Sequence, residues 1–386
     1  MFTRSAFLLS LLTVFWAVGC IPAAELPPHL PVDTGEVAPA PLPVEALPDR
    51  AELHYDGRFE RADPREAVCA WSASAVSVCF RGTTVNVRLS PGANRFVAVV
   101  DGVPVKILAD GAADPQHPPA RPAPKLYALA SSLPEGEHRA TVFKATEAAV
   151  GNATFAGFQL GAGSAVLPAR PAQRRLTVIG DSISCGYGNE AASKEESFSP
   201  ATENAWWTYG ALAARAVGAD YQCIAWSGRK MHPNFTIPEV YDRTLPADAG
   251  SHWPGDREKP DAILVNLCTN DFNVPELPDR AAWVRAYRDF LARLRREAPQ
   301  ATIYCALGPM MSDGYPKGRP SLSTAREWIG EVVKGCQDAG DPKVRFLEFA
   351  PQQAVNGIGA NWHPSVRTHQ IMADKLTAAV RTDLGW

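Results

Sequence analysis

The pattern of apolar and polar positions changes about halfway along the chain. Residues 49–165 contain short runs in which apolar and polar side chains alternate, such as TTVNVRL (83–89) and RFVAVVDGVPVKI (95–107). A period of two predicts strands that bury one face, and the Asp-Gly pair within the second run suits a two-residue hairpin turn. This half therefore predicts an antiparallel β-sandwich.

In residues 172–386 apolar strands alternate with amphipathic helices. The expected strands are 176–180, 221–226, 262–267, 302–307 and 345–349. Asp279 is expected to cap a helix with an apolar face made by Trp283, Tyr287, Phe290, Leu291 and Leu294. Ser323 or Thr324 is expected to cap a second helix, which ends near Gly340. Strand and helix in alternation predict a parallel sheet covered on both faces, an α/β/α domain whose ligands bind beyond the carboxyl ends of the strands.

The N-terminus carries an apolar run at 6–19 with no acidic residue before Glu25. This pattern predicts a secretory signal peptide over residues 1–24, and the run is shorter than the ~20 residues that span a bilayer. The segment AVGC resembles a lipoprotein signal that ends at Cys20, so a lipid anchor and simple cleavage both stay open. We expect a protein that is secreted, or held in the periplasm or cell envelope.

Residues 25–48 contain seven prolines, a composition that favours extended chain and predicts a tether. The net charge of −3 lacks the basic excess expected of a nucleic-acid-binding protein. No Cys-x-x-Cys pair occurs, so we expect no metal site and no thioredoxin-like redox motif. Cys69 and Cys79 flank a short strand-like stretch, which leaves their pairing open.

The segment VIGDSISCGYGNE (178–190) admits three interpretations. Residues 186–191 fit a dinucleotide-binding fingerprint, but the glycines come late after the strand and no acidic residue follows the second strand. A tight turn is the simplest interpretation of Gly-Asp-Ser. The third is a nucleophile, Ser182, which would need a base for its proton and donors for an oxyanion.

Residues near other predicted strand ends supply these groups. Gly228 follows the second strand of this domain, Asn270 follows the third, and His363 precedes a helix that begins near Ser365. A glycine lets its backbone N–H approach a ligand, and an asparagine amide can donate a hydrogen bond. Each of these residues alone would more often be structural, but their combination and order favour catalysis.

These blocks resemble the Ser-Gly-Asn-His (SGNH, or GDSL) hydrolase superfamily. IGDSISCGYGNE, LCTND and NWHP, behind a predicted sandwich that contains FRGTTVNVRL and VVDG, are most similar to carbohydrate esterase family 2, which includes acetyl xylan esterases. GDSIS is not the Gly-x-Ser-x-Gly elbow of α/β-hydrolases. The likeness extends over nearly all of the chain after the signal and is strongest in the second half.

The resemblance implies a secreted, two-domain esterase, a jelly-roll sandwich before an SGNH hydrolase domain, that removes acetyl groups from plant polysaccharides such as xylan or glucomannan. Ser182 would be the nucleophile and His363 the base. The backbone N–H groups of Ser182 and Gly228 and the side chain of Asn270 would form the oxyanion hole. No cofactor is implied.

The chain departs from the superfamily pattern at two positions. Cys268 stands where many members have Gly, and we interpret it as a tolerated small residue. Ala360 stands where most members have the aspartate that orients the histidine. We therefore expect a Ser-His dyad in which a backbone carbonyl of Ala360, Asn361 or Trp362 accepts the proton of His363 Nδ1.

Trp362 and Tyr187 are the candidate residues for stacking on a sugar ring, although either could simply pack its loop. Two other functions stay open at this level. The chain could be a carbohydrate-binding protein with a degenerate esterase domain, which the missing aspartate would favour. It could also hydrolyse longer acyl esters on the same fold, which would require a long apolar groove.

Overall fold

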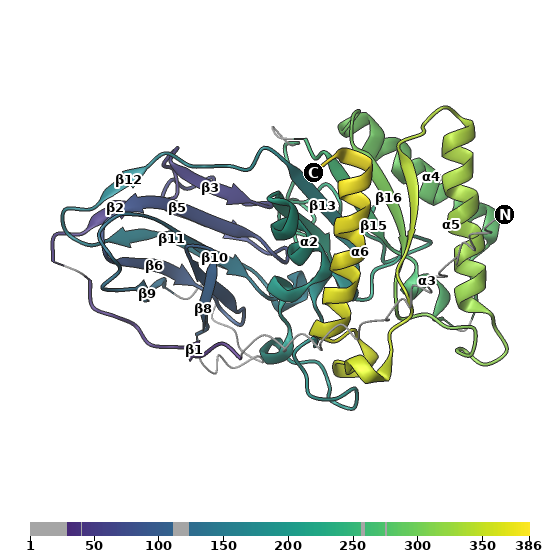
Figure 1. Cartoon of the computed structure of the whole chain (residues 1–386), viewed down its shortest axis with the longest axis horizontal. Helices are drawn as coiled ribbons and strands as arrows, with labels where there is room; N and C mark the ends of the chain where they lie inside the picture. Colours follow the sequence, from purple (N-terminus) through teal and green to yellow (C-terminus); the bar gives the residue numbers. More distant parts are fainter. Residues whose placement is uncertain (1–28, 40, 111–122, 256–258, 275) are drawn as a thin grey trace, which may run out of the picture.

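The computed structural model describes residues 29–39, 41–110, 123–255, 259–274 and 276–386. The expected signal peptide, with Cys20, lies outside the described residues. Two domains lie side by side, a β-rich domain and an α/β domain that ends in a long C-terminal helix (Figure 1). Within the described part of the chain, no helix combines the length and apolarity needed to cross a membrane.

The first domain consists of two sheets that face each other. One has the order β1-β8-β7-β10-β5-β12 with β3 beside β5, and the other has the order β2-β11-β6-β9 with β4 beside β11. A single buried cluster of residues from both sheets, including Phe80, Val87 and Phe158, fills the space between them. The bounds are β1 Val32–Asp33, β2 Val44–Ala46, β3 Leu53–Asp56, β4 Ala67–Cys69, β5 Ala75–Arg81, β6 Val85–Ser90, β7 Phe96–Val100, β8 Val103–Leu108, β9 Lys125–Ala130, β10 Glu137–Lys144, β11 Ala153–Leu160 and β12 Ala165–Leu167.

The predicted hairpin is confirmed, because β7 and β8 are joined by Asp101 and Gly102, both with positive φ. One expectation for this half, the tether over residues 25–48, needs correction. Part of the proline-rich segment belongs to the sandwich, since β2 pairs with β11, Ala46 is fully buried, and β1 makes a parallel pair with β8. Prolines at this spacing exclude a long strand but leave room for two or three paired residues.

Cys69 and Cys79 are both free thiols. Cys69 lies in β4 and Cys79 lies in β5, so the two residues belong to different sheets. Burial raises the pKa of the Cys69 thiol to about 12, which keeps it protonated and unreactive.

The second domain contains a parallel sheet with the order β14-β13-β15-β16-β17. Its strands are β13 Arg175–Gly180, β14 Asp220–Ala225, β15 Ala262–Asn266, β16 Thr302–Leu307 and β17 Val344–Glu348. Each end of all five strands lies within one residue of the expected end. The first strand of this sheet, β13, lies between β14 and β15, so the chain reverses its winding direction there and opens a crevice at the carboxyl end of β13.

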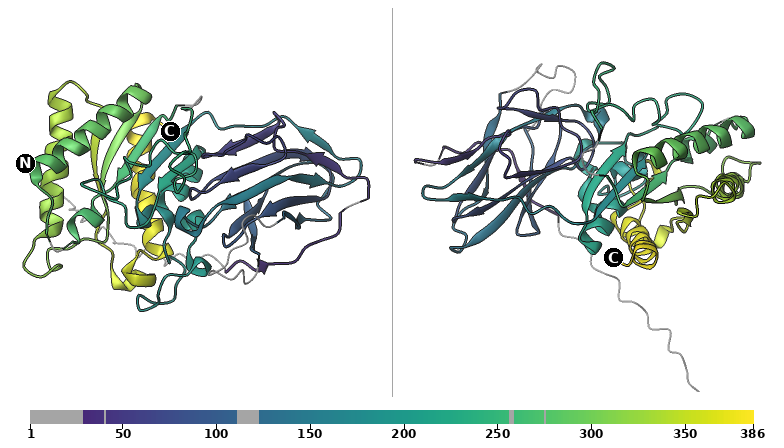
Figure 2. Two further views of the ribbon diagram at one scale, coloured as in Figure 1. Left: turned by 180° about the vertical axis from the view of Figure 1, so that it is seen from behind. Right: turned by 90° about the horizontal axis from the view of Figure 1, so that it is seen from above.

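Helices cover both faces of this sheet (Figure 2). Side chains of α2 (Tyr209–Val217) and α6 (Val366–Leu384) share a cluster with Val178 and Leu264. Side chains of α4 (Arg280–Glu297) and α5 (Ser321–Asp338) share another cluster with the next residues, Ile179 and Val265. Successive strand residues thus point to opposite faces, as the period of two requires.

The predicted helix ends are confirmed in one case and wrong in another. Asp279 Oδ1 accepts from Ala282 N at 2.8 Å, and the five expected residues of α4 are buried. Helix α5, however, begins at Ser321, two residues before the expected cap. The carboxylate of Asp313 takes the capping role, because it accepts from both the N–H and the hydroxyl of Ser323.

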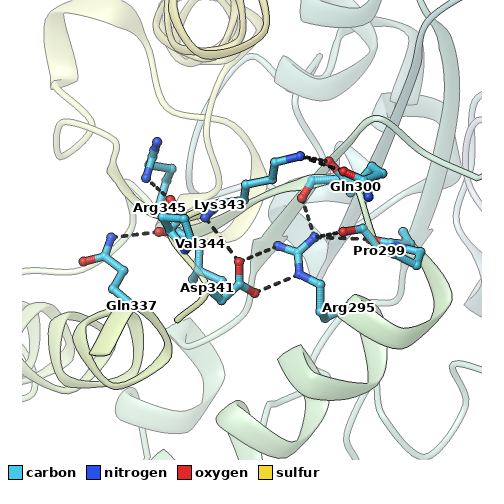
Figure 3. Close-up of polar contacts among 11 residues, drawn as sticks. Arg295, Pro299, Gln300, Gln337, Asp341, Lys343, Val344 and Arg345 are labelled. Atoms are coloured by element: carbon cyan, nitrogen blue, oxygen red, sulfur yellow. Dashed lines mark hydrogen bonds and ion pairs between the residues drawn. The ribbon is translucent and has the colours of Figure 1, made fainter. Parts of the chain in front are cut away.

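An ion pair and hydrogen bonds to backbone carbonyls connect the segments that precede β16 and β17 (Figure 3). Arg295, near the end of α4, makes a bidentate contact with Asp341 at 2.8 and 3.0 Å. Its Nη1 also donates to the carbonyl of Ala301 at 2.7 Å. Lys343 Nζ donates to Gln300 O at 3.0 Å, so β16 and β17 are joined at their amino ends.

The two domains share buried side chains. Ala75, Val99 and Phe143 of the sandwich belong to the same cluster as the side chains of α2 and α6. Polar contacts cross the boundary too: Ala205 N donates to Ala145 O at 2.8 Å, and Trp71 Nε1 donates to Arg243 O at 3.1 Å. The sandwich therefore packs directly against the domain that carries Ser182.

Candidate active site

Ser182 is the first residue of a short helix, α1 (Ser182–Cys185), at the carboxyl end of β13. Asp181 caps this helix, because its Oδ1 accepts from Ile183 N at 3.0 Å. The turn needs glycine before it, since a Cβ on Gly180 would lie 2.1 Å from Ser184 Oγ. Strand end, cap and helix together place Ser182 at the carboxyl edge of the sheet, where the winding direction reverses.

His363 lies next to Ser182 although 181 positions separate them in the sequence. Its Nε2 lies 2.8 Å from Ser182 Oγ, and its Nδ1 lies 3.0 Å from Ala360 O and 3.2 Å from Asn361 O. The expected contact between Nδ1 and backbone carbonyls is therefore present. Burial lowers the pKa of His363 to about 4, and the two carbonyls only partly oppose that shift.

The loop before His363 has an unusual backbone. Asn361 and Trp362 both adopt left-handed conformations, with φ values of 50° and 65°. This tight turn places the Ala360 and Asn361 carbonyls beside the imidazole. The third candidate carbonyl, that of Trp362, instead accepts from Gln352 Nε2 at 2.7 Å, which corrects the expectation for that residue.

Tyr187 contacts the base directly. Its ring stacks on the imidazole of His363 with centroids 4.1 Å apart, and it also packs against Phe198 at 4.5 Å. Its hydroxyl lies 3.4 Å from Asn361 Oδ1. The sequence suggested Tyr187 as a platform for sugar, whereas the structure places its ring against the histidine, where it limits rotation of the imidazole.

Asn270 and Gly228 lie beyond the carboxyl ends of β15 and β14. Gly228 has φ +77°, a left-handed conformation that favours glycine. The Asn270 amide, in α3 (Thr269–Phe272), donates to Arg229 O at 2.9 Å and to Asp181 Oδ2 at 3.3 Å. The amide that was expected to donate to an oxyanion therefore bonds to two protein oxygens in this structure.

Asp271 is a residue of this site that sequence reasoning missed. Its carboxylate accepts from Met231 N at 3.1 Å, from His232 N at 2.9 Å and from Trp283 Nε1 at 2.8 Å. Burial raises its pKa to about 6. The motif Cys-Thr-Asn-Asp could have pointed to this residue, because Asp271 is its last member. Asp271 holds the segment that follows Gly228.

A cavity of about 690 Å³ is lined in part by Asn361 and Trp362, the two residues that precede His363 in the chain. Its wall includes Trp362, which is 56% exposed, and Tyr315, which is 68% exposed. Lys194 Nζ lies 4.0 Å from the centre of the Trp362 ring and packs over it. Trp362, a candidate from the sequence for stacking on a sugar ring, therefore lies in the wall of a cavity. Tyr315 and Met310, which follow β16, also line this cavity and were not singled out from the sequence.

One cluster among the described residues has the geometry to hold a metal ion, and it consists of His54, Asp56 and Asp220. It lies at the amino end of β14, the opposite edge of the sheet from Ser182. Burial opposes protonation of His54, but the carboxylates of Asp220 and Asp56 outweigh it and raise the pKa to about 10. The protonated His54 forms ion pairs with Asp56 and Asp220, and these contacts join the two domains without a metal ion.

A serine hydroxyl bonded to an imidazole at the carboxyl edge of a parallel sheet is the arrangement of a serine hydrolase. The family model described as "Carbohydrate esterase 2 N-terminal" matches residues 55–169, and that of the "GDSL-like Lipase/Acylhydrolase family" matches residues 178–371. The chain therefore belongs to carbohydrate esterase family 2, whose members are carboxylic ester hydrolases.

Individual relatives agree with this assignment. The chain is 39% identical over 345 residues to the cellulase/esterase CelE of Acetivibrio thermocellus, covering 88% of this chain but only 40% of CelE. It is 28% identical over 363 residues to an acetylxylan esterase / glucomannan deacetylase of Cellvibrio japonicus, covering 86% and 91%. A family two carbohydrate esterase from Clostridium thermocellum, solved with cellohexaose, superposes with a TM-score of 0.77 at 38% identity, covering 86% and 99%.

Proposed function

We propose that this protein is a carbohydrate O-acetyl esterase that removes acetyl groups from plant polysaccharides of the xylan and glucomannan type. The observation that carries the proposal is the 2.8 Å contact between Ser182 Oγ and His363 Nε2, with Nδ1 directed at backbone carbonyls. The C. japonicus relative, described as an acetylxylan esterase / glucomannan deacetylase, supports the substrate class.

Acylation follows from this geometry. Ser182 Oγ attacks the acetyl carbonyl carbon while its proton passes to His363 Nε2. The carbonyl oxygen becomes an oxyanion, and the N–H groups of Ser182 and Gly228 and the Asn270 amide stabilise it. The C–O bond to the sugar then breaks, and the sugar oxygen takes the proton from Nε2. An acetyl group remains on Ser182.

Deacylation repeats these steps with water. His363 Nε2 takes one proton from a water molecule, whose oxygen attacks the acetyl carbon. The bond to Ser182 Oγ breaks, Oγ recovers its proton from Nε2, and acetate leaves. The carbonyls of Ala360 and Asn361 hold the Nδ1 proton throughout, so that Nε2 faces Ser182 with a free lone pair.

The cavity lined by Asn361 and Trp362 is our proposed site for the sugar, because these two residues directly precede His363. Exposed aromatic faces at Trp362 and Tyr315 suit the apolar faces of sugar rings. The structure of the C. thermocellum esterase with cellohexaose supports a β-linked glycan as the kind of ligand that binds this fold. We further propose that the protein is exported, on the basis of its N-terminal apolar segment.

The test is release of acetate from acetylated xylan and acetylated glucomannan, compared with hydrolysis of p-nitrophenyl acetate, butyrate and octanoate. We expect acetate release from at least one polysaccharide and a steep loss of rate with acyl length. Faster hydrolysis of octanoate than acetate would favour a lipase-like function. Binding of polysaccharide without any ester hydrolysis would favour a carbohydrate-binding protein.

A further inference from the structure

A buried carboxylate from the sandwich domain reaches the proposed oxyanion hole. Glu147 lies in the segment between β10 and β11, within the region matched by the family's N-terminal model, and is 2% exposed. Its Oε2 accepts a hydrogen bond from Ser227 N at 2.8 Å. Cys185 Sγ, at the end of the helix that begins with Ser182, lies 3.8 Å from the same oxygen.

Ser227 directly precedes Gly228, whose N–H is one of the proposed oxyanion donors. A hydrogen bond on the preceding N–H restrains the chain just before Gly228. Asp271 holds the other end of the same segment through the N–H groups of Met231 and His232. The loop that carries Gly228 is thus held at both ends by buried carboxylates, and one of them comes from the other domain.

Glu147 is itself fixed in place by its neighbours. Its backbone N–H donates to Glu203 Oε2 at 2.8 Å, and its carbonyl accepts from Lys144 Nζ at 3.1 Å. Lys144 is fully buried, and its charge opposes the rise in the pKa of Glu147. Burial raises the pKa of Glu147, and the hydrogen bond from Ser227 opposes that rise. Because Glu147 is itself held in place, its hydrogen bond fixes the position of the Ser227 backbone N–H.

We propose that Glu147 is a positioning residue of the esterase reaction, by which the sandwich domain sets the orientation of the Gly228 N–H toward the oxyanion. This inference rests on the proposed function, since it needs an oxyanion at Ser182. It assigns the first domain a part in catalysis in addition to packing. A carboxylate that only joined the two domains would affect stability without acting on the transition state.

The test compares five purified full-length proteins in hydrolysis of p-nitrophenyl acetate: wild type, Glu147→Ala, Glu147→Gln, Glu147→Leu and Asp220→Ala. Asp220 is the matched control, because its side chain is 12% exposed and contacts His54 across the same domain boundary at 3.2 Å, far from Gly228. Glu147→Leu is included, since it fills the same volume without an acceptor. Circular dichroism and Tm report on folding.

We expect Glu147→Ala and Glu147→Leu to lower kcat about 10–100-fold with KM within about twofold, less than the full loss of an oxyanion donor. Glu147→Gln should keep at least about a third of kcat, because its amide oxygen still accepts from Ser227. The Ki of phenylboronic acid, which forms a tetrahedral adduct on a serine hydroxyl, should rise about tenfold in the Ala and Leu variants only.

Equal losses of kcat in Glu147→Ala and Asp220→Ala, with unchanged boronate binding, would overturn the inference and leave the proposed function intact. Failure of both Glu147→Ala and Glu147→Leu to fold would also overturn it, since the carboxylate would then serve stability alone. A folded wild type without esterase activity would remove the proposed function and the inference together.

Discussion

The two halves of the active site are held by different kinds of group. On the side of the base, His363 is oriented by two carbonyls of its own loop and by the ring of Tyr187. On the side of the oxyanion, the loop that carries Gly228 is held by the carboxylates of Glu147 and Asp271. The first half is local and neutral, whereas the second is assembled across domains from buried charges.

In a Ser-His-Asp triad one aspartate both fixes the tautomer of the imidazole and stabilises the imidazolium. A carbonyl fixes the tautomer of the imidazole but stabilises the imidazolium less than a carboxylate would. The lowered pKa of His363 has the same consequence, because a neutral base is available over a wide pH range but binds a proton weakly. Transition-state stabilisation should therefore depend strongly on the oxyanion side.

The largest effect should come from removing either member of the dyad. We expect Ser182→Ala and His363→Ala each to lower kcat for p-nitrophenyl acetate by about 10⁴-fold or more, since they remove the nucleophile or its base. His138→Ala, which affects a sandwich histidine bonded to Asp101, is the matched control and should keep full activity. Retention of a tenth of the activity in Ser182→Ala would disprove its role.

The oxyanion side is tested next. Asn270→Ala should lower kcat about 10²–10³-fold, the usual cost of one oxyanion donor. The variant also removes the bond to Arg229 O, so Asn270→Asp, with no amide donor but a similar shape, separates donation from volume. A change confined to KM would instead make Asn270 a substrate contact.

The dependence of kcat/KM on pH tests the protonation state of His363. The pKa of His363 is lowered to about 4, and only the neutral imidazole can accept a proton from Ser182. We therefore expect kcat/KM to stay level as pH falls from 7 to about 5, and then to drop about tenfold per unit below pH 4. Stability measured over the same range excludes acid unfolding. An acid limb near pH 6.5 that persists in Asp271→Asn, which removes the carboxyl group with a pKa of about 6, would mean that burial does not control the imidazole.

The smallest effect should come from the Asn361 side chain. If backbone carbonyls orient His363, loss of this amide should cost at most about tenfold in kcat, roughly 1.4 kcal/mol of barrier. Asn361→Gly is the better variant, because φ is 50° there and Ala would add backbone strain. A loss as large as that of His363→Ala, in a folded protein, would make Asn361 the third catalytic residue.

Features that depend on neighbours in sequence were predicted well. The strands of the second sheet, the buried face of α4 and the start of α6 near Ser365 follow from periodicity and local hydrogen bonding. The wrong predictions involve longer-range partners. Helix α5 begins earlier than predicted, and Asp313 caps its first turn. Strand β2 belongs to the sandwich because it pairs with β11. Neither partner can be identified from the local pattern.

The active site divides in the same way. The sequence alone predicted the proposed nucleophile, the proposed base and the absence of the aspartate, because Ser182, His363 and Ala360 lie within recognisable motifs at predicted element ends. Only the tertiary structure decided which carbonyls meet Nδ1, that Tyr187 packs on the imidazole, and that Glu147 reaches Ser227 from the other domain. A buried carboxylate acts through the donor it meets at about 3 Å, and that donor is chosen by domain packing, which no local periodicity encodes.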